Sequence, residues 1–143
     1  MARFIGRYEH SLDPKGRVIL PVKFRAAFDK GGFLSQFHDG CLALWTPEEF
    51  ERQLQAMQSA SEQGRDERNL ARVWASGSSE IEVDKAGRMA IPQYLRQFAQ
   101  LDAPTTGAGV PVLVLGAIDR VELWSPSVWQ EKVLPSERQL TDA

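Results

Sequence analysis

Basic and acidic side chains gather in a short stretch near the N-terminus that could contact a nucleic acid. The segment LDPKGRVILPVKFR, residues 12–25, places Lys15 and Arg17 at a turn that begins at Asp13. The planar fork of Arg matches phosphate or the edge of guanine, and Lys offers phosphate a point charge. An ion pair between Arg17 and Asp13 is the structural alternative. The stretch therefore suggests a DNA contact, a stabilised turn, or both.

The same pattern returns later in the chain as VDKAGRMAIPQYLR, residues 83–96, at an offset of 71 (84 − 13). The positions identical in both copies are Asp13/Asp84, Gly16/Gly87, Arg17/Arg88, Pro21/Pro92 and Arg25/Arg96. Internal repetition of this kind indicates two units of one fold.

A second repeated motif extends the duplication. LWTP begins at Leu44 and LWSP begins at Leu123, an offset of 79 (123 − 44). We therefore predict two homologous units, residues 1–75 and 76–143. The greater offset means that the second unit is longer between its two motifs, and the extra length is expected in the loop 102–111.

Each copy reads as a turn followed by a strand and a short helix. Asp13 and Asp84 suit the first position of a type I turn, and Gly16 and Gly87 supply the positive φ that such a loop needs. The pattern predicts local β-hairpins, with Arg17–Leu20 and Arg88–Ile91 as return strands. Pro21 and Pro92 would then start helices.

The remaining segments complete an α+β pattern. Residues 7–12 alternate as a half-buried strand does. GGFLSQF and CLALW are predicted to pair around HDG, and VPVLVLGAI and RVELW around Asp119. Helices are expected at 47–58, 66–75 and 126–134. Thr46 and Ser125 are N-cap candidates, with Glu49 completing a capping box, and the tail PSERQLTDA is expected to fray. Half of this chain would bury a marginal core, so the two units are predicted to close on each other as one small barrel-like domain.

Charge is distributed unevenly along the chain. Residues 1–25 carry six basic and two acidic residues, a net of +4, and the remainder carries −6 for a total of −2. Basic residues without a basic counterpart in the second copy are the better candidates for a partner, and these are Arg3, Arg7, Lys15 and Lys23. Together with Arg17 they are predicted to contact DNA. Arg88 is expected to contribute less, because Glu80 and Glu82 beside it would repel phosphate.

Catalytic chemistry is not indicated. The two histidines, His10 and His38, lack partners at metal-ligand spacing, and Cys41 has no base near it in the sequence. No phosphate-binding glycine loop appears. We therefore predict no enzyme activity, no catalytic or metal site, no cofactor and no small-molecule substrate. A single cysteine and the lack of a long apolar run predict a cytoplasmic protein without membrane contact.

The two copies, in register with LWTP and LWSP, resemble the MraZ family of bacterial transcription regulators. The resemblance covers nearly the whole chain, and it implies two tandem AbrB/SpoVT-like units. The family's Asp-x-x-x-Arg signature falls on Asp13 and Arg17, and on Asp84 and Arg88.

The resemblance also implies partners. It implies a ring-shaped homo-oligomer in the cytoplasm and nucleoid. The ring would bind direct repeats in double-stranded DNA ahead of its own cell-division and cell-wall gene cluster. The alternative hypothesis is a ring-forming scaffold whose basic patch binds an acidic protein.

Overall fold

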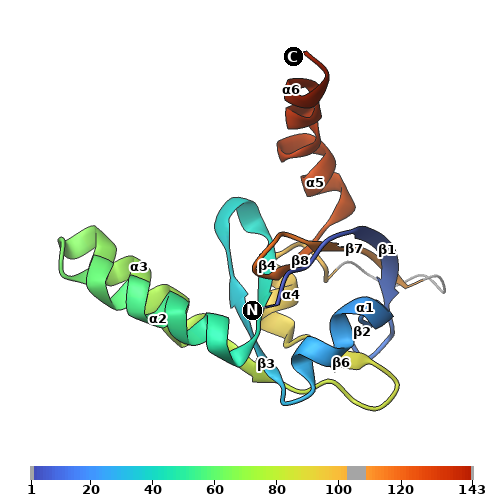
Figure 1. The fold of residues 1–143 in the computed structure, drawn as a ribbon, viewed down its shortest axis with the longest axis horizontal. Helices are drawn as coiled ribbons and strands as arrows, with labels where there is room; N and C mark the ends of the chain where they lie inside the picture. Colours follow the sequence, from blue (N-terminus) through green and yellow to red (C-terminus); the bar gives the residue numbers. More distant parts are fainter. Residues whose placement is uncertain (1, 103–108, 143) are drawn as a thin grey trace.

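Both halves of the chain contain strands and helices (Figure 1). The computed structural model describes residues 2–102 and 109–142. The first half forms β1 (Arg7–Leu12), β2 (Arg17–Ile19), α1 (Val22–Arg25), η1 (Ala26–Phe28), β3 (Gly32–Gln36), η2 (His38–Gly40), β4 (Leu42–Trp45), α2 (Pro47–Ser61) and α3 (Arg65–Gly77). The second half forms β5 (Ser79–Ile81), β6 (Arg88–Ala90), α4 (Gln93–Phe98), β7 (Val110–Gly116), β8 (Val121–Trp124), α5 (Pro126–Lys132), η3 (Leu134–Glu137) and α6 (Arg138–Thr141).

Strand pairing crosses between the two halves. A six-stranded antiparallel sheet has the order β1-β7-β8-β4-β3-β5, and β2 pairs with β6 in a separate two-stranded ribbon. Thus β1 lies against β7 of the other half, and β5 lies against β3. The strands β4 and β8 pair at the centre of the sheet. The architecture is therefore α+β, built from two related units that exchange strands.

The prediction of two local hairpins was wrong. Each turn closes as expected, since the Asp13 N–H donates to the Arg17 carbonyl at 2.9 Å. However, β1 and β2 then diverge into different sheets, and each finds its partner in the other half. Sequence reasoning assumed the nearest partner, whereas burial of both units' apolar faces favours the exchanged arrangement. The described strands also form no closed barrel, because β1 and β5 remain as sheet edges.

The main core lies between the sheet and the β2–β6 ribbon. Val18 and Met89, the central residues of the ribbon, are fully buried and face inward. Phe24 packs edge-on against Phe4 at a ring-centroid distance of 5.5 Å, and Phe28 stacks on Phe4. Both halves therefore contribute to one shared core, which fixes the ribbon on the body of the domain.

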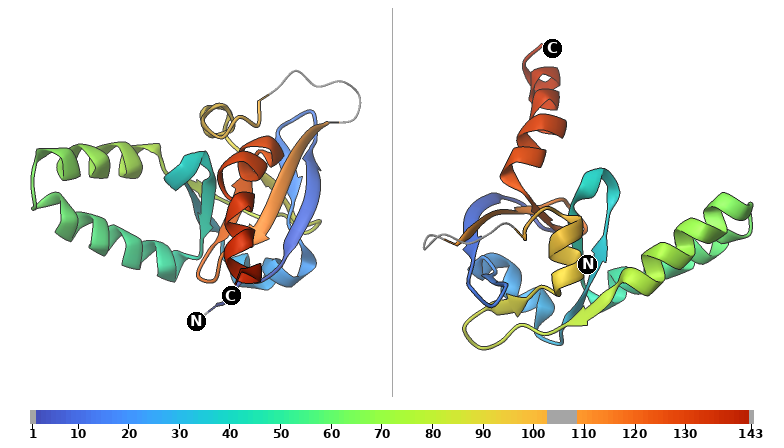
Figure 2. Two further views of the ribbon diagram at one scale, coloured as in Figure 1. Left: turned by 90° about the horizontal axis from the view of Figure 1, so that it is seen from above. Right: turned by 180° about the vertical axis from the view of Figure 1, so that it is seen from behind.

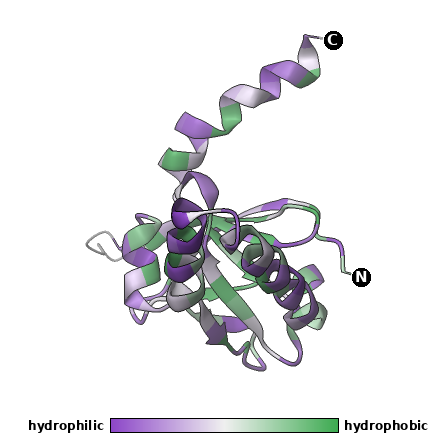
Figure 3. Ribbon diagram, turned by 90° about the vertical axis from the view of Figure 1, so that its left-hand side faces the viewer, coloured by the Kyte–Doolittle hydropathy of each residue, from purple (hydrophilic) through white to green (hydrophobic). Residues whose placement is uncertain are grey.

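Two helical arms leave this body in different directions (Figures 1 and 2). Helices α2 and α3 form an antiparallel hairpin, while α5, η3 and α6 continue as a second arm that ends at the C-terminus. The expectation of a frayed tail was wrong, because residues 134–141 are helical. Polar and apolar residues alternate along that arm when it is coloured by hydropathy (Figure 3).

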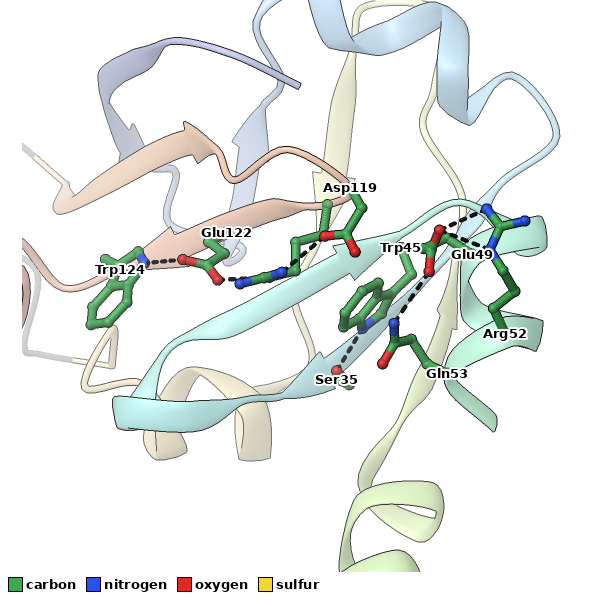
Figure 4. Close-up of polar contacts among 9 residues, drawn as sticks. Ser35, Trp45, Glu49, Arg52, Gln53, Asp119, Glu122 and Trp124 are labelled. Atoms are coloured by element: carbon green, nitrogen blue, oxygen red, sulfur yellow. Dashed lines mark hydrogen bonds and ion pairs between the residues drawn. The ribbon is translucent and has the colours of Figure 1, made fainter. Parts of the chain in front are cut away.

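Polar contacts stabilise the first turns of α2 and, separately, the neighbouring strands of the sheet (Figure 4). Thr46 caps α2 by accepting from the Glu49 N–H at 3.2 Å. The Glu49 carboxylate accepts from Arg52 and Gln53 instead of returning to Thr46, so the predicted capping box is only half formed. These bonds, that of Arg52 first, hold the pKa of Glu49 below its usual value.

The two matched tryptophans of the LW motifs are buried and hydrogen-bonded. Trp45 Nε1 donates to Ser35 Oγ at 2.9 Å, and Trp124 Nε1 donates to Glu122 Oε1 at 3.0 Å. Both indoles therefore serve packing within the chain. Ser125 makes no capping bond to α5. The longer loop predicted at 102–111 falls largely on residues 103–108, which lie outside the described residues.

A candidate nucleic-acid interface on the β2–β6 ribbon

The first Asp-x-x-Gly-Arg turn holds its arginine through one carboxylate. Asp13 Oδ1 accepts from the backbone N–H groups of Lys15 and Arg17, both at 2.9 Å. Asp13 Oδ2 accepts from Arg17 Nε at 2.7 Å. These bonds, chiefly that of the Arg17 backbone N–H, hold the pKa of Asp13 below its usual 3.8. The carboxylate is therefore ionised at neutral pH and orients the guanidinium.

The second turn repeats this geometry with other neighbours. Asp84 Oδ1 accepts from the N–H groups of Ala86 and Arg88 at 2.9 Å, and Oδ2 accepts from Arg88 Nε at 2.8 Å. The Arg88 backbone N–H is the main cause of a lowered pKa at Asp84. In both turns the hydrogen bonds use Nε, and the two terminal nitrogens of each arginine donate to no other described residue.

The ribbon brings both arginines onto one outer surface. Arg17 pairs with Ala90 and Ile19 pairs with Arg88 in the antiparallel register. Because side chains alternate across a strand, these four residues share one face while Val18 and Met89 face the core. We call this face, formed by Arg17, Ile19, Arg88 and Ala90, the ribbon face. It presents two guanidinium forks on a diagonal with an exposed isoleucine between them.

Each turn is also locked by the opposite half. The Leu20 N–H donates to the Gly87 carbonyl at 2.8 Å, and the Ile91 N–H donates to the Gly16 carbonyl at 3.0 Å. Gly16 and Gly87 have φ of +77° and +82°. A Cβ at Gly16 would overlap the Arg96 guanidinium, and a Cβ at Gly87 would overlap that of Arg25. The ribbon can therefore form only when both halves are in place.

The other predicted contact residues are dispersed. Lys15 is exposed at the tip of the first turn, and Lys23 is exposed on α1, just beyond the end of β2. Arg7 lies at the opposite end of β1 from the turn, roughly 20 Å away for six extended residues. Its guanidinium lies over the Trp129 ring, 5.3 Å from the centroid. Arg3 precedes the bridge between Phe4 and Ile118. The structure groups Lys15, Arg17 and Arg88, but neither Arg3 nor Arg7 joins them.

Sequence reasoning missed two residues of this surface. Lys85 is exposed at the second turn, one position before Ala86. The comparison of aligned positions matched Lys15 with Ala86, and it therefore overlooked Lys85, although the charge of Lys85 is visible in the sequence. Ile19 was included in the predicted return strand Arg17–Leu20 without a face being assigned to it, and its side chain is on the outer face. Once the strand is located, the alternation of side chains along it predicts that Val18 faces the core and Ile19 faces outward.

Other kinds of site find little support in the described ranges, 2–102 and 109–142. There, histidine, cysteine and acidic side chains form no group able to hold a metal ion. Within those same ranges, every helix is too short or too polar to cross a membrane. Cys41 is fully buried, and burial first, then the Glu122 carboxylate, raises the pKa of its thiol. This cysteine is packed as a core residue and held in its unreactive form.

The fold and the ribbon face together define a tandem-repeat protein with an arginine-bearing β-ribbon. A family model described as "MraZ protein, putative antitoxin-like" matches residues 3–73 and again residues 75–141. The chain belongs to the MraZ family.

Curated relatives agree with this assignment. The chain is 37% identical over 139 residues to a protein of Kocuria rhizophila named Transcriptional regulator MraZ, covering 97% of this chain and 92% of the relative. It is 34% identical over 142 residues to a protein of the same name from Heliobacterium modesticaldum, covering 97% and 94%. Both names are those of transcriptional regulators and neither is that of an enzyme.

Proposed function

We propose that the protein is a sequence-specific DNA-binding transcription regulator that acts on its own cell-division and cell-wall operon through direct repeats. The observation that carries the proposal is the ribbon face, on which the guanidinium forks of Arg17 and Arg88 lie on one diagonal. A two-stranded β-ribbon fits the major groove of B-DNA, and Arg is the usual reader of guanine there. Family membership and the names of the relatives support the same reading.

The aspartates have a positioning role in this proposal. Each occupies the Nε of its arginine, which leaves the two terminal nitrogens for a base edge or a phosphate. Holding a side chain in one geometry before binding reduces the conformational entropy lost on binding. Lys15, Lys23 and Lys85 then supply phosphate contacts around the ribbon face. Arg3 and Arg7 lie away from the ribbon face and contribute only to the positive electrostatic potential around it.

Self-association completes the proposal. One ribbon face offers few contacts, which suits weak binding only. Joining identical subunits makes the later contacts intramolecular and can raise avidity by about 10²–10⁴. A head-to-tail ring matches direct repeats in DNA, since neighbours are then related by the same step. In this proposal the two units span residues 1–75 and 76–143, and the protein is found at the nucleoid.

The test is a gel shift with DNA from upstream of the protein's own gene, beside a scrambled fragment of equal length. Sequence-selective retardation is expected, with affinity falling steeply between about 50 and 200 mM salt. Each neutralised phosphate contributes about −0.9 to the slope of log K against log salt. A flat salt dependence, or equal binding to both fragments, would contradict the proposal. Ring formation without any DNA binding would favour the scaffold that binds an acidic protein.

A further inference from the structure

The α2–α3 arm carries an apolar groove at its root. The groove has a volume of about 310 Å³, and its apolar lining comes from Phe37, Met57, Leu70, Val73, Trp74 and Phe98. Leu70 and Val73 are 52% and 58% exposed on α3. Trp74 is buried, yet its Nε1 has no hydrogen-bond partner within the described chain. Exposed aliphatic side chains beside an unsatisfied buried donor indicate a surface that lacks its partner.

The internal repeat indicates what kind of partner is missing. When the LWTP and LWSP motifs are aligned, Phe50 of α2 corresponds to Trp129 of α5, and Leu54 corresponds to Val133. In the first half Phe50 is covered by Trp74 of α3, with ring centroids 5.2 Å apart. In the second half no described helix lies alongside α5 in the place that α3 takes on α2 (Figure 2). Within the described residues, the C-terminal arm therefore lacks the partner helix that α3 provides for α2.

The C-terminal arm also exposes an apolar side chain far from the body of the domain. Leu140 of α6 is 83% exposed. The two arms of one chain point in different directions, so the C-terminal arm does not reach the groove of its own chain (Figure 1). A second copy of the chain can supply both missing partners at once.

Helix α3 and the C-terminal arm carry charges of both signs and differ only slightly in their balance. Asp66 and Glu67 leave α3 with a net charge of +1 (3 − 2), and Lys132 and Arg138 leave the arm with a net charge of −1 (2 − 3). Helix α3 exposes three arginines that form no ion pair within the described chain, and the C-terminal arm exposes three such acidic residues. The arginines are Arg65, Arg68 and Arg72, and the acidic residues are Glu131, Glu137 and Asp142.

We propose that the C-terminal arm of one copy packs along the α2–α3 arm of the next, with Leu140 seated in the groove beside Leu70 and Val73. This inference rests on the self-association proposed above and assigns its contact surfaces. The contact joins two different surfaces, so it propagates head to tail and produces a ring when the rotation closes.

Two single variants test the contact, each breaking one side. Val73→Glu disrupts the groove but leaves the arm, and Leu140→Glu disrupts the arm but leaves the groove. Val22→Glu is the matched control, because Val22 is 74% exposed and lies on α1, away from both arms. Light scattering should show a large assembly for the wild type and the control, and a species of 16.0 kDa for each of the two variants. Thermal midpoints and circular dichroism establish that the variants are folded.

Mixing the two variants gives the decisive measurement. Val73→Glu retains a working arm and Leu140→Glu retains a working groove. An equimolar mixture should therefore form one contact and stop at a dimer, with twice the 16.0 kDa mass of a single chain. In a second test, Val73→Cys and Leu140→Cys are mixed with oxidised glutathione, which is reduced to two glutathione thiols as the disulfide forms, and buried Cys41 does not compete. A disulfide-linked dimer on a non-reducing gel is expected, and its absence would contradict the contact.

Assembly of either Glu variant at wild-type size would overturn the proposed contact while leaving self-association intact. A mixture that remains monomeric would overturn it as well. A monomeric wild-type protein would refute both the contact and self-association. The gel shift would then still test DNA binding separately.

Discussion

The two Asp-x-x-Gly-Arg turns have nearly the same backbone and hydrogen bonds but differ in what surrounds them. The carboxylate-to-Nε distances are 2.7 and 2.8 Å, and the glycine φ angles are +77° and +82°. The first ion pair is less exposed than the second, at 31% and 30% for its two side chains against 41% and 42%. Identical residues in the two copies therefore maintain the fold, whether or not they also touch DNA.

The positions that differ between the copies separate the two turns chemically. The first turn has Pro14 and Lys15 where the second has Lys85 and Ala86. Each tip thus carries one lysine, and the tips are closer in charge than the aligned positions suggested. The clearest remaining difference on the ribbon face is Ile19 of the first copy against the smaller Ala90 of the second. The backbones of the two turns are therefore nearly symmetric. Any difference between the two copies in the proposed DNA recognition should come from the side chains that they carry.

The largest effect is expected from removing the basic side chains of the first turn. Lys15→Ala with Arg17→Ala should weaken operator binding by at least about 100-fold, since a base-reading contact contributes about 1–3 kcal/mol. The matched double variant Lys85→Ala with Arg88→Ala should weaken operator binding only about tenfold. The reason is that the negative charge of Glu82 already lowers the positive electrostatic potential at the second turn. Fluorescence anisotropy at fixed salt measures both, with assembly size as the control. Equal losses would mean that the two copies read DNA equally.

A second prediction tests the backbone conformation that the two turns share. Gly16→Ala and Gly87→Ala should each lower the free energy of unfolding by about 1–3 kcal/mol, because a non-glycine residue is strained at these φ values. The overlaps with Arg96 and Arg25 add to the cost. Urea unfolding measures the two variants in parallel. Similar losses are expected, and a clear difference between them would show that the two turns are not equivalent in the fold.

The third prediction concerns the one large apolar side chain of the ribbon face. Ile19→Ala should weaken operator binding about three- to tenfold, since an aliphatic group in the major groove can contact the thymine methyl. Replacing operator thymines by deoxyuridine removes only that methyl, so the variant should lose nothing further on such DNA. Ala90→Ile provides the reverse change on the second copy. If Ile19→Ala and deoxyuridine act additively, Ile19 does not contact a thymine methyl.

The smallest effect should come from the aspartates. Asp13→Asn and Asp84→Asn keep an acceptor for the turn but lose the ion pair, and exposed ion pairs contribute little to stability. Since the folded pKa of each carboxyl is lowered, its stabilisation is present above 3.8 and is lost as pH falls through the lower folded value. Thermal midpoints of the double variant should therefore fall less steeply with acid below that pH than those of the wild type. Parallel curves would contradict this.

Much of the secondary structure was predictable because its signals are local. Thr46 followed by Pro47 marked the start of α2, and HDG marked the turn between β3 and β4. Both strands of the second half around Asp119 were also predicted correctly. The partners of β1, β2 and β6 were not predictable in this way, because these strands pair with segments far away in the sequence. The repeat indicated two units but did not indicate that they exchange strands.

The candidate site was predicted in part for the same reason. Arg17 and Arg88 were recognisable from the repeated turn, and Lys15 from its charge. Their convergence on one face depends on the pairing of β2 with β6, which joins strands from opposite halves of the chain. Conversely, Arg7 was grouped with Lys15 by proximity in sequence. An extended strand separates them, and the contact with Trp129 holds Arg7 on another surface.

The cross-locking of the two glycine turns has a consequence for the timing of synthesis. When Ile19 has left the ribosome, its partner Arg88 has not yet been translated. At about 5–20 residues per second, the stretch between the two copies takes roughly 4–14 seconds to make. An emerging chain therefore has no ribbon to place on DNA until its second half follows. If the proposed function holds, a messenger cut short before the codons of β6 (Arg88–Ala90) would yield a protein that lacks the ribbon face and cannot bind the operator.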